Sequence, residues 1–263
     1  MNARRGGWEN GRRGNAWIGT SGWSYPHWRG VFYPQDLPSS RWLAHYAARF
    51  PAVEINNTFY QLPEDTSLEA WRNAVPDDFR FTVKASRYIT HTKKLKDPER
   101  TLEAFLHSIE TLESRLGPLL FQLPPRWQFN VERLESFLDT LGSRHQAAFE
   151  FRDPSWFDER VYERLAEHGA SLCIYDLDGF ESPHQVTADF VYVRLHGPEG
   201  AYHGSYGHAA LGRWSRLIEQ WLADGLEVWC FFDNDEQGYA THDAARLQSR
   251  LYLSPAGNAR SAG

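Results

Sequence analysis

The segment Val191-Tyr192-Val193-Arg194-Leu195-His196 is a run of apolar residues with β-strand character that ends on charged and polar side chains. The same pattern recurs along the chain. Eight such runs are found, at residues 17–21, 53–56, 81–84, 119–122, 148–152, 172–176, 191–196 and 228–234. In a (β/α)8 barrel the C-terminal ends of all strands meet on one face, where the active sites of such enzymes lie. The sequence therefore predicts an α/β fold of the (β/α)8, TIM-barrel-like class, with these polar groups around one mouth.

Segments with helical periodicity lie between most of these runs, as the crossover connections of parallel strands require. One begins after Asp97-Pro98, and another begins after Asn130 and stops at Gly142. The sixth connection, residues 178–189, contains glycine and proline and shows no helical period. We therefore expect one irregular crossover near the sixth strand.

The length of 263 residues, with 41% hydrophobic residues, fits one barrel domain. We expect this domain to span residues 17–253. Residues 1–16 are basic and glycine-rich and are predicted to be a disordered tail, and residues 254–263 a flexible C-terminal tail. The sequence has neither the apolar run of a targeting signal nor a transmembrane stretch, so we expect a cytoplasmic protein without a membrane partner.

The formal net charge of −6 argues against a broad surface for nucleic acid, because phosphate binding depends on clustered Lys and Arg. Nucleic acid is therefore a possible but not a favoured partner. The two cysteines, Cys173 and Cys230, lie inside predicted strands without metal-ligand spacing and are expected to be buried, inert thiols. The sequence leaves the oligomeric state open.

Several ordered motifs together resemble one known family. They include Gly19-Thr20-Ser21-Gly22-Trp23-Ser24-Tyr25, Val53-Glu54-Ile55-Asn56, Leu120-Phe121-Gln122-Leu123-Pro124-Pro125 and Tyr192-Val193-Arg194-Leu195-His196-Gly197. They resemble the YecE-like family, catalogued as domain of unknown function seventy-two, over about residues 17–252. The resemblance implies a TIM-barrel-like fold and no established reaction. The chain departs from the family pattern at Asp233, where asparagine is usual.

Pairs of polar residues at alternate positions lie on the same side of a strand. The pairs are Glu54 and Asn56, Glu150 and Arg152, and Arg194 and His196. Burying an unpaired charge against the apolar helices outside the barrel is costly, so these side chains are expected to point inward near the mouth. Their apolar neighbours then face the helices.

Glu54 and Glu150 are candidates for a general acid/base pair, because burial and nearby cations can tune carboxyl groups for proton transfer. His196 ends a strand and is the candidate proton carrier at neutral pH. The alternative is a structural network of Glu and Arg that closes the top of the barrel.

Lys84, Arg152 and Arg194 come from three predicted strands, and converging cations favour an anion such as phosphate or carboxylate. The alternative is that each cation pairs with a nearby carboxylate. A desolvated Lys84 could also act as a nucleophile. We expect Arg194→Ala to weaken ligand binding more than it lowers stability.

Aromatic residues Trp23, Tyr25 and Tyr60 follow the first two strands and could stack on a sugar ring or base, or could pack the loops. His91 lies on the loop after the third strand, and Tyr206 on a glycine-rich loop, residues 197–207, that could close over a ligand. The remaining ligand-binding candidates are Asn56, Gln122 and Asn234.

Three functions are consistent with these residues. The leading hypothesis is an enzyme that uses acid/base chemistry on a small anionic, hydroxylated or sugar-like molecule at the mouth. The second is a metal-dependent nucleic-acid phosphodiesterase resembling endonuclease-four-type barrels. The third is a ligand-binding sensor without catalysis. Because no short histidine spacing supports a metal site, we expect no tightly held metal and no cofactor.

Overall fold

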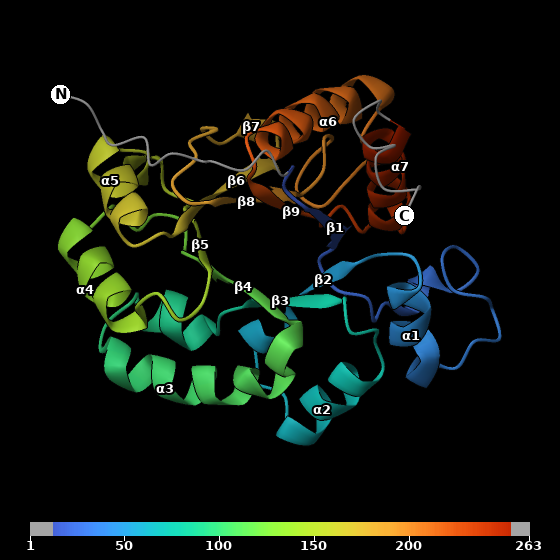
Figure 1. Ribbon diagram of the computed structural model, residues 1–263, viewed down its shortest axis with the longest axis horizontal. Helices are drawn as coiled ribbons and strands as arrows, with labels where there is room; N and C mark the ends of the chain where they lie inside the picture. The colour runs from blue at the N-terminus through green and yellow to red at the C-terminus, as the bar shows by residue number, and fades with distance from the viewer. Residues whose placement is uncertain (1–12, 254–263) are drawn as a thin grey trace.

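Eight parallel strands curve around a common axis within residues 13–253, the part of the chain that the computed structural model describes (Figure 1). Their hydrogen-bonded order is β1-β9-β8-β6-β5-β4-β3-β2, and a bridge between Ser21 and Glu54 joins the two ends. The predicted (β/α)8 fold is confirmed. The strands are β1 Ala16–Thr20, β2 Ala52–Ile55, β3 Arg80–Lys84, β4 Leu116–Gln122, β5 Ala147–Glu150, β6 Ser171–Leu177, β8 Phe190–Leu195 and β9 Glu227–Phe232.

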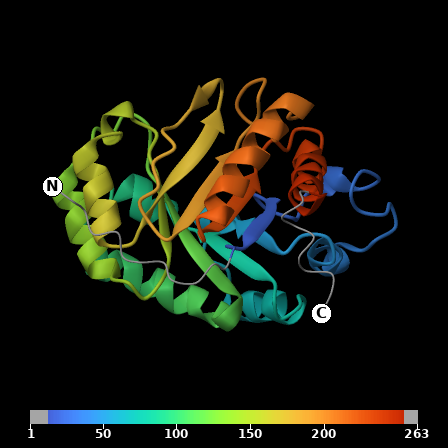
Figure 2. The ribbon, with the colours of Figure 1, turned by 45° about the horizontal axis from the view of Figure 1, so that its top comes forward.

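Helices surround this barrel, and Figure 2 shows the strands running between them. Helix α4 shows how the sequence sets their limits. The Asn130 side chain accepts a hydrogen bond from the Arg133 N–H at 2.9 Å, and Gly142 follows the last turn with φ of 63°. The α-helices are α1 Trp42–Ala47, α2 Asp65–Asn73, α3 Pro98–Ile109, α4 Val131–Leu141, α5 Glu159–Glu167, α6 His208–Ala223 and α7 Tyr239–Leu253.

The connection from β6 to β8 is the predicted irregular crossover. It holds only a two-residue strand, β7 Phe180–Glu181, which pairs antiparallel with β6. Side chains fasten it to the barrel in place of a helix: Ser182 Oγ accepts from the Tyr175 N–H, and Thr187 Oγ1 accepts from the Leu172 N–H, each at 2.8 Å. The expectation for this segment is confirmed.

Side chains alternate between the two faces of each strand, so the outward-facing and inward-facing residues form two separate buried regions. Residues such as Val53, Phe149 and Val193 face the helices, as predicted, and belong to the large outer core. A smaller cluster fills the barrel interior. Its members are Ala52, Leu120, Ala148, Cys173, Phe190, Tyr192, Trp229 and Phe231, with Trp17 packed against them.

The N-terminal end of the barrel is closed by aromatic rings. Trp17 and Trp229 stack with ring centroids 5.0 Å apart, and the Arg80 guanidinium lies 5.4 Å from the Trp17 ring. The buried ion pairs of the barrel interior lie at the opposite, C-terminal mouth. The chemistry of the protein is expected at that mouth.

The expected tails of residues 1–16 and 254–263 lie outside the described residues, except for residues 13–16. The N–H of Gly14 already donates to the Leu222 carbonyl at 2.9 Å, and β1 begins at Ala16, one residue before the expected start of the domain. No helix in residues 13–253 is both long and apolar enough to cross a membrane.

Candidate active site

Arg194, in β8, lies at the centre of a buried charge cluster. Its Nε and Nη2 donate to the two oxygens of Glu54 at 3.1 and 2.7 Å, and Nη1 donates to Glu150 at 2.8 Å. Nη2 also donates to Asp233 at 3.2 Å. The side chain is 1% exposed. Burial alone would lower the pKa of Arg194, but the surrounding carboxylates outweigh it and raise that pKa.

Glu54, in β2, has partners on both carboxylate oxygens. Ser21 Oγ donates to Oε1 and Tyr192 OH donates to Oε2, both at 2.7 Å, in addition to the two bonds from Arg194. The side chain is completely buried. A carboxylate with both oxygens engaged by internal donors has little capacity left for a ligand, so the geometry fits a role in holding Arg194 in place.

Glu150, at the end of β5, pairs with Arg152 and Arg194. Burial would raise the pKa of Glu150, but the two guanidinium groups outweigh it and hold that pKa well below its usual range. The Arg152 guanidinium also lies 4.8 Å from the Tyr175 ring, and its Nη2 is 3.1 Å from His196 Nε2. Glu150 therefore orients Arg152 at the mouth.

His196 connects this cluster to Asp233. Its Nε2 faces guanidinium nitrogens of Arg152 and Arg194, which can only donate, so Nε2 is the acceptor. The proton therefore sits on Nδ1, which donates to Asp233 Oδ2 at 3.0 Å. Burial would raise the pKa of Asp233, but the bond from His196 and the charge of Arg194 lower it overall.

The sequence singled out Asp233 as a departure from the family pattern but not as one of the catalytic or ligand-binding candidates. Its side chain is 16% exposed, and only its Oδ2 has a partner in the described part of the chain. The alternation of β9 could have located it, because Trp229 and Phe231 point into the barrel and residue 233 continues the same face. The Oδ1 atom is available to a ligand.

Lys84, at the end of β3, differs from the other cations of the cluster. Its Nζ lies 4.6 Å from the centroid of the Phe59 ring, and within residues 13–253 it forms neither a hydrogen bond nor an ion pair. Burial, with a smaller contribution from Arg194, lowers the pKa of Lys84 to about 8. Directly after the neighbouring strand β2, the buried Oδ1 of Asn56 has no partner in the described residues either.

His91 packs its ring against Phe59, with centroids 5.0 Å apart, and its Nδ1 lies 2.9 Å from Thr90 Oγ1. Burial lowers the pKa of His91 to about 4, and Lys84 adds to this effect, so the ring is neutral at pH 7. The π-helix Tyr88–Thr92 carries this histidine. Such turns are frequent at functional sites.

Tyr202, in the loop after β8, covers His196. Its N–H donates to the His196 carbonyl at 2.6 Å, and the two rings are 5.6 Å apart. His203 fastens the same loop to Glu236 through a contact of 2.9 Å. The sequence placed the loop correctly but did not single out Tyr202 as the ring above the site.

Two candidates from the same region support the loop instead of facing the mouth. Tyr206 OH accepts from the Gly197 N–H at 3.0 Å, and Asn234 Nδ2 donates to the Gly204 carbonyl at 2.8 Å. Asp243 accepts from Asn234 as well. These two residues therefore fix the loop that carries Tyr202.

The remaining candidates divide between the site and its surroundings. Tyr25 OH donates to the Ser21 carbonyl at 2.6 Å, while Tyr60 is 82% exposed. Trp23 packs against Trp71 outside the barrel. Gln122 is in register with Glu150 on the adjacent strand. The cluster thus contains Glu54, Lys84, Glu150, Arg152, Arg194, His196 and Asp233, with Asn56, Tyr25 and His91 beside it.

No group of three or more His, Cys, Asp or Glu side chains in residues 13–253 is arranged to hold a metal ion. The carboxylates at the mouth are instead bonded to guanidinium groups. Cys173 and Cys230 are buried, and burial raises the pKa of both thiols.

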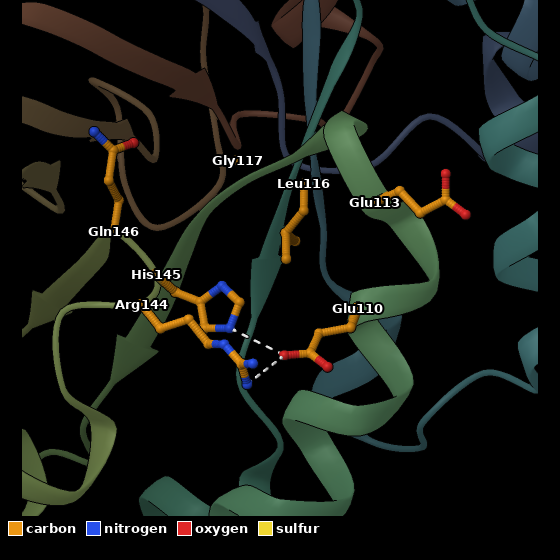
Figure 3. Close-up of a pocket in the computed structure, with 7 residues that line it drawn as sticks. All are labelled: Glu110, Glu113, Leu116, Gly117, Arg144, His145 and Gln146. Carbon is orange, nitrogen blue, oxygen red and sulfur yellow. Dashed lines mark hydrogen bonds and ion pairs between the residues drawn. The ribbon is translucent and has the colours of Figure 1, made fainter.

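A pocket of about 350 Å³ lies at the opposite end of the barrel, where β4 and β5 begin (Figure 3). Glu110 there faces Arg144 at 3.1 Å and His145 at 3.5 Å. Arg144 is 75% exposed and Glu110 39%, whereas His145 is 13% exposed and burial lowers its pKa. The Glu110–Arg144 ion pair is therefore largely solvated, unlike the ion pairs at the mouth. The pocket is lined by Glu110, Glu113, Leu116, Gly117, Arg144, His145 and Gln146.

Comparisons with known proteins agree with the fold. The chain is similar to the UPF0759 protein YecE of Escherichia coli K12, 32% identical over 157 residues, which are 58% of this chain and 54% of that protein. The chain therefore spans about half the length of this relative. It is also similar to the UPF0759 protein YunF of Bacillus subtilis, 26% identical over 92% of this chain and 96% of that protein.

The structure is similar to the crystal structure of a DUF72 family protein from Thermotoga maritima. The TM-score is 0.81 at 33% identity, covering 90% of this chain and 99% of that one. A DUF72 family protein from Enterococcus faecalis has the same fold, with a TM-score of 0.79 at 23% identity and coverage of 91% and 96%. The model of the family described as protein of unknown function DUF72 matches residues 17–262. The chain therefore belongs to the DUF72 family, as its motifs had indicated.

Proposed function

We propose that the C-terminal mouth of the barrel is the active site of an enzyme that carries out acid/base chemistry on a small anionic organic molecule. The observation that carries this proposal is Lys84. A cation that is partly buried and forms no ion pair is costly unless an anion joins it or it gives up its proton. An enzyme can use either outcome, because a bound anion can be a substrate and a deprotonated amine can react.

The roles follow from which atoms are already occupied. Lys84 and the Nη1 of Arg152 would contact the anion, because neither is used in an ion pair of the described residues. Asp233, with His196 behind it, would exchange protons through its open Oδ1. Glu54, Glu150 and Arg194 would position these groups.

This assignment changes the roles expected from the sequence. Glu54 and Glu150 were candidates for the acid and base, and Arg194 for an anion contact. Their mutual bonds favour positioning roles for all three, since each is buried and fully engaged. The acid/base role then passes to Asp233 and His196.

Thermal unfolding with added ligands tests the proposal. We expect phosphate, citrate or pyruvate to raise the Tm of the wild-type protein, and neutral glucose to leave it unchanged. A ligand at a hundredfold its Kd stabilises a protein by about 2.7 kcal/mol. Lys84→Met should abolish the shift, and the exposed-lysine control Lys96→Met should keep it. Equal shifts in both variants would contradict an anion site at Lys84.

Turnover separates the enzyme from a sensor. Any anion that binds is incubated with the protein and followed by proton NMR. New signals that appear with the wild-type protein and vanish in Asp233→Asn support catalysis. Binding without chemical change in the wild type would favour a ligand-binding sensor.

A further inference from the structure

The lysines of this chain are confined to one segment. Of the 28 Lys and Arg residues, four are lysines, and they are Lys84, Lys93, Lys94 and Lys96. Every other cationic side chain of these two types is arginine. Three of the four lysines belong to the loop after β3, and only Lys84 stands inside the barrel.

Lysine and arginine differ in the one property that matters at Lys84. Arginine stays charged and binds carboxylate or phosphate in a bidentate manner, whereas a desolvated lysine can lose its proton and become a nucleophile. This chain uses arginine for the ion pairs of the site, at Arg152 and Arg194. A lysine beside them indicates that an amine, not only a positive charge, is required.

The surroundings of Lys84 fit an amine that loses its proton. Its Nζ has the Phe59 ring on one side and no ion pair in the described residues. Burial brings its pKa to about 8. The Asp233 carboxylate is near enough to influence that pKa and has one free oxygen with which to relay a proton.

We propose that Lys84 is a catalytic nucleophile that forms a Schiff base with the carbonyl carbon of a small substrate, which also carries a carboxylate or phosphate group. This inference rests on the proposed function and names its chemistry. The anionic group would lie against Arg152, whose Nη1 is unused in the described residues, and the carbonyl would face Lys84.

The step balances without an oxidant or reductant. The lone pair of Nζ forms a C–N bond, and the π-electron pair of the carbonyl moves to oxygen, which takes up a proton. The carbinolamine then expels this oxygen as water after a second protonation. The product is a protonated imine. Both protons of the water come from the Lys84 ammonium, which loses two of its three, and Asp233 would carry them from the nitrogen to the departing oxygen.

Reductive trapping tests the imine directly. The wild-type protein is mixed with pyruvate, glyoxylate or dihydroxyacetone phosphate in the presence of sodium cyanoborohydride, and the adduct is located by peptide mass spectrometry. We expect about tenfold more adduct on Lys84 than on Lys96 for at least one probe, because only Lys84 is a desolvated amine. Lactate, which has the carboxylate but neither a ketone nor an aldehyde, should compete for the site and form no adduct.

Matched variants separate this inference from the proposed function. Lys84→Arg keeps the positive charge and should still show an anion-dependent Tm shift, but should lose the adduct; Lys96→Arg should retain both. Probe binding without excess adduct on Lys84 would overturn the Schiff base and leave the anion site intact. Failure of every probe to bind would count against both.

A measurement without ligand completes the test. Competitive acetylation over a range of pH gives the titration midpoint of each lysine in the folded wild-type protein. We expect a midpoint near pH 8 for Lys84, following its lowered pKa. A midpoint above pH 10 for Lys84 would overturn the inference even if no variant folds.

Discussion

The two ends of the barrel are built from the same residue types and differ in how those residues meet water. At the N-terminal end, Glu110 and Arg144 pair across an open pocket with side chains 39% and 75% exposed (Figure 3). At the C-terminal mouth, Glu54 and Arg194 pair with side chains 0% and 1% exposed. The difference shows that a pocket in the protein surface need not contain the desolvated charged groups that make a site reactive.

The physical reason is the dielectric environment of each pair. In water an ion pair gains little, because both ions are already hydrated and salt screens them. In the interior the attraction is stronger, but each ion has lost its hydration, so removal of one partner is costly. The mouth should therefore respond strongly to substitution and to pH, and the N-terminal pocket should not.

The largest effect is expected for Arg194→Met. It leaves Glu54 and Glu150 buried without their shared cation, and breaking such a buried pair costs about 3–5 kcal/mol. Urea unfolding measures the loss, with Arg144→Met as the matched control at the other end. This reverses the order expected from the sequence, in which Arg194 mattered more for binding than for stability. A loss below about 1 kcal/mol would contradict the network described at the mouth.

The next effect is the pH dependence of stability that Lys84 causes. Its pKa is about 8 in the folded protein and 10.5 ordinarily, so between these values the unfolded chain binds more protons and stability rises with pH. The stability of the wild type relative to Lys84→Met should rise by roughly 3 kcal/mol from pH 7.5 to 10.5, at 1.36 kcal/mol per pKa unit. Urea unfolding at each pH gives the difference. A flat difference would show that Lys84 is solvated like Lys96.

Asp233→Asn should have an intermediate effect. The hydrogen bond from His196 would lose its charged acceptor, and bonds to charged groups contribute about 1.5–3 kcal/mol. The pKa of Asp233 is lowered in the folded state, so its contribution is present at neutral pH and is lost as pH falls through that folded pKa. Unfolding at pH 7 and in acid should therefore show a gap between the two proteins that narrows in acid. A gap that widens in acid would refute this sign.

The smallest effect is expected at the N-terminal pocket. Glu110→Gln removes an exposed ion pair with Arg144 and a longer contact, of 3.5 Å, with the partly buried His145, and exposed pairs contribute about 0–1 kcal/mol. The change in stability should stay below about 0.5 kcal/mol at 0.15 M salt, and the anion-dependent Tm shift of the mouth should be unchanged. Loss of that shift in Glu110→Gln would move the binding site to this end.

The strand pattern located most of the candidate site because, in a parallel barrel, residues near the C-terminal ends of all strands lie at the same mouth. Glu54, Glu150 and Arg194 are distant in sequence, yet each ends a strand on its inward face, so their meeting could be predicted. Loop residues could not be placed in this way. Trp23 lies outside the barrel, and Tyr202 reaches His196 through a loop whose course no periodicity describes.

The sequence by itself determined the number, direction and inward faces of the strands, because alternation and crossover length are local properties of the chain. It also determined the family to which the chain belongs. Only the tertiary structure decided which charges are paired. Arg194 and Lys84 are both cations at strand ends. Arg194 forms ion pairs with carboxylates, whereas Lys84 forms no ion pair in the described residues, although Glu150, Glu54 and Asp233 are near enough to influence its pKa. That distinction depends on contacts between separate strands, because such contacts determine how stable and how reactive a buried charged group is.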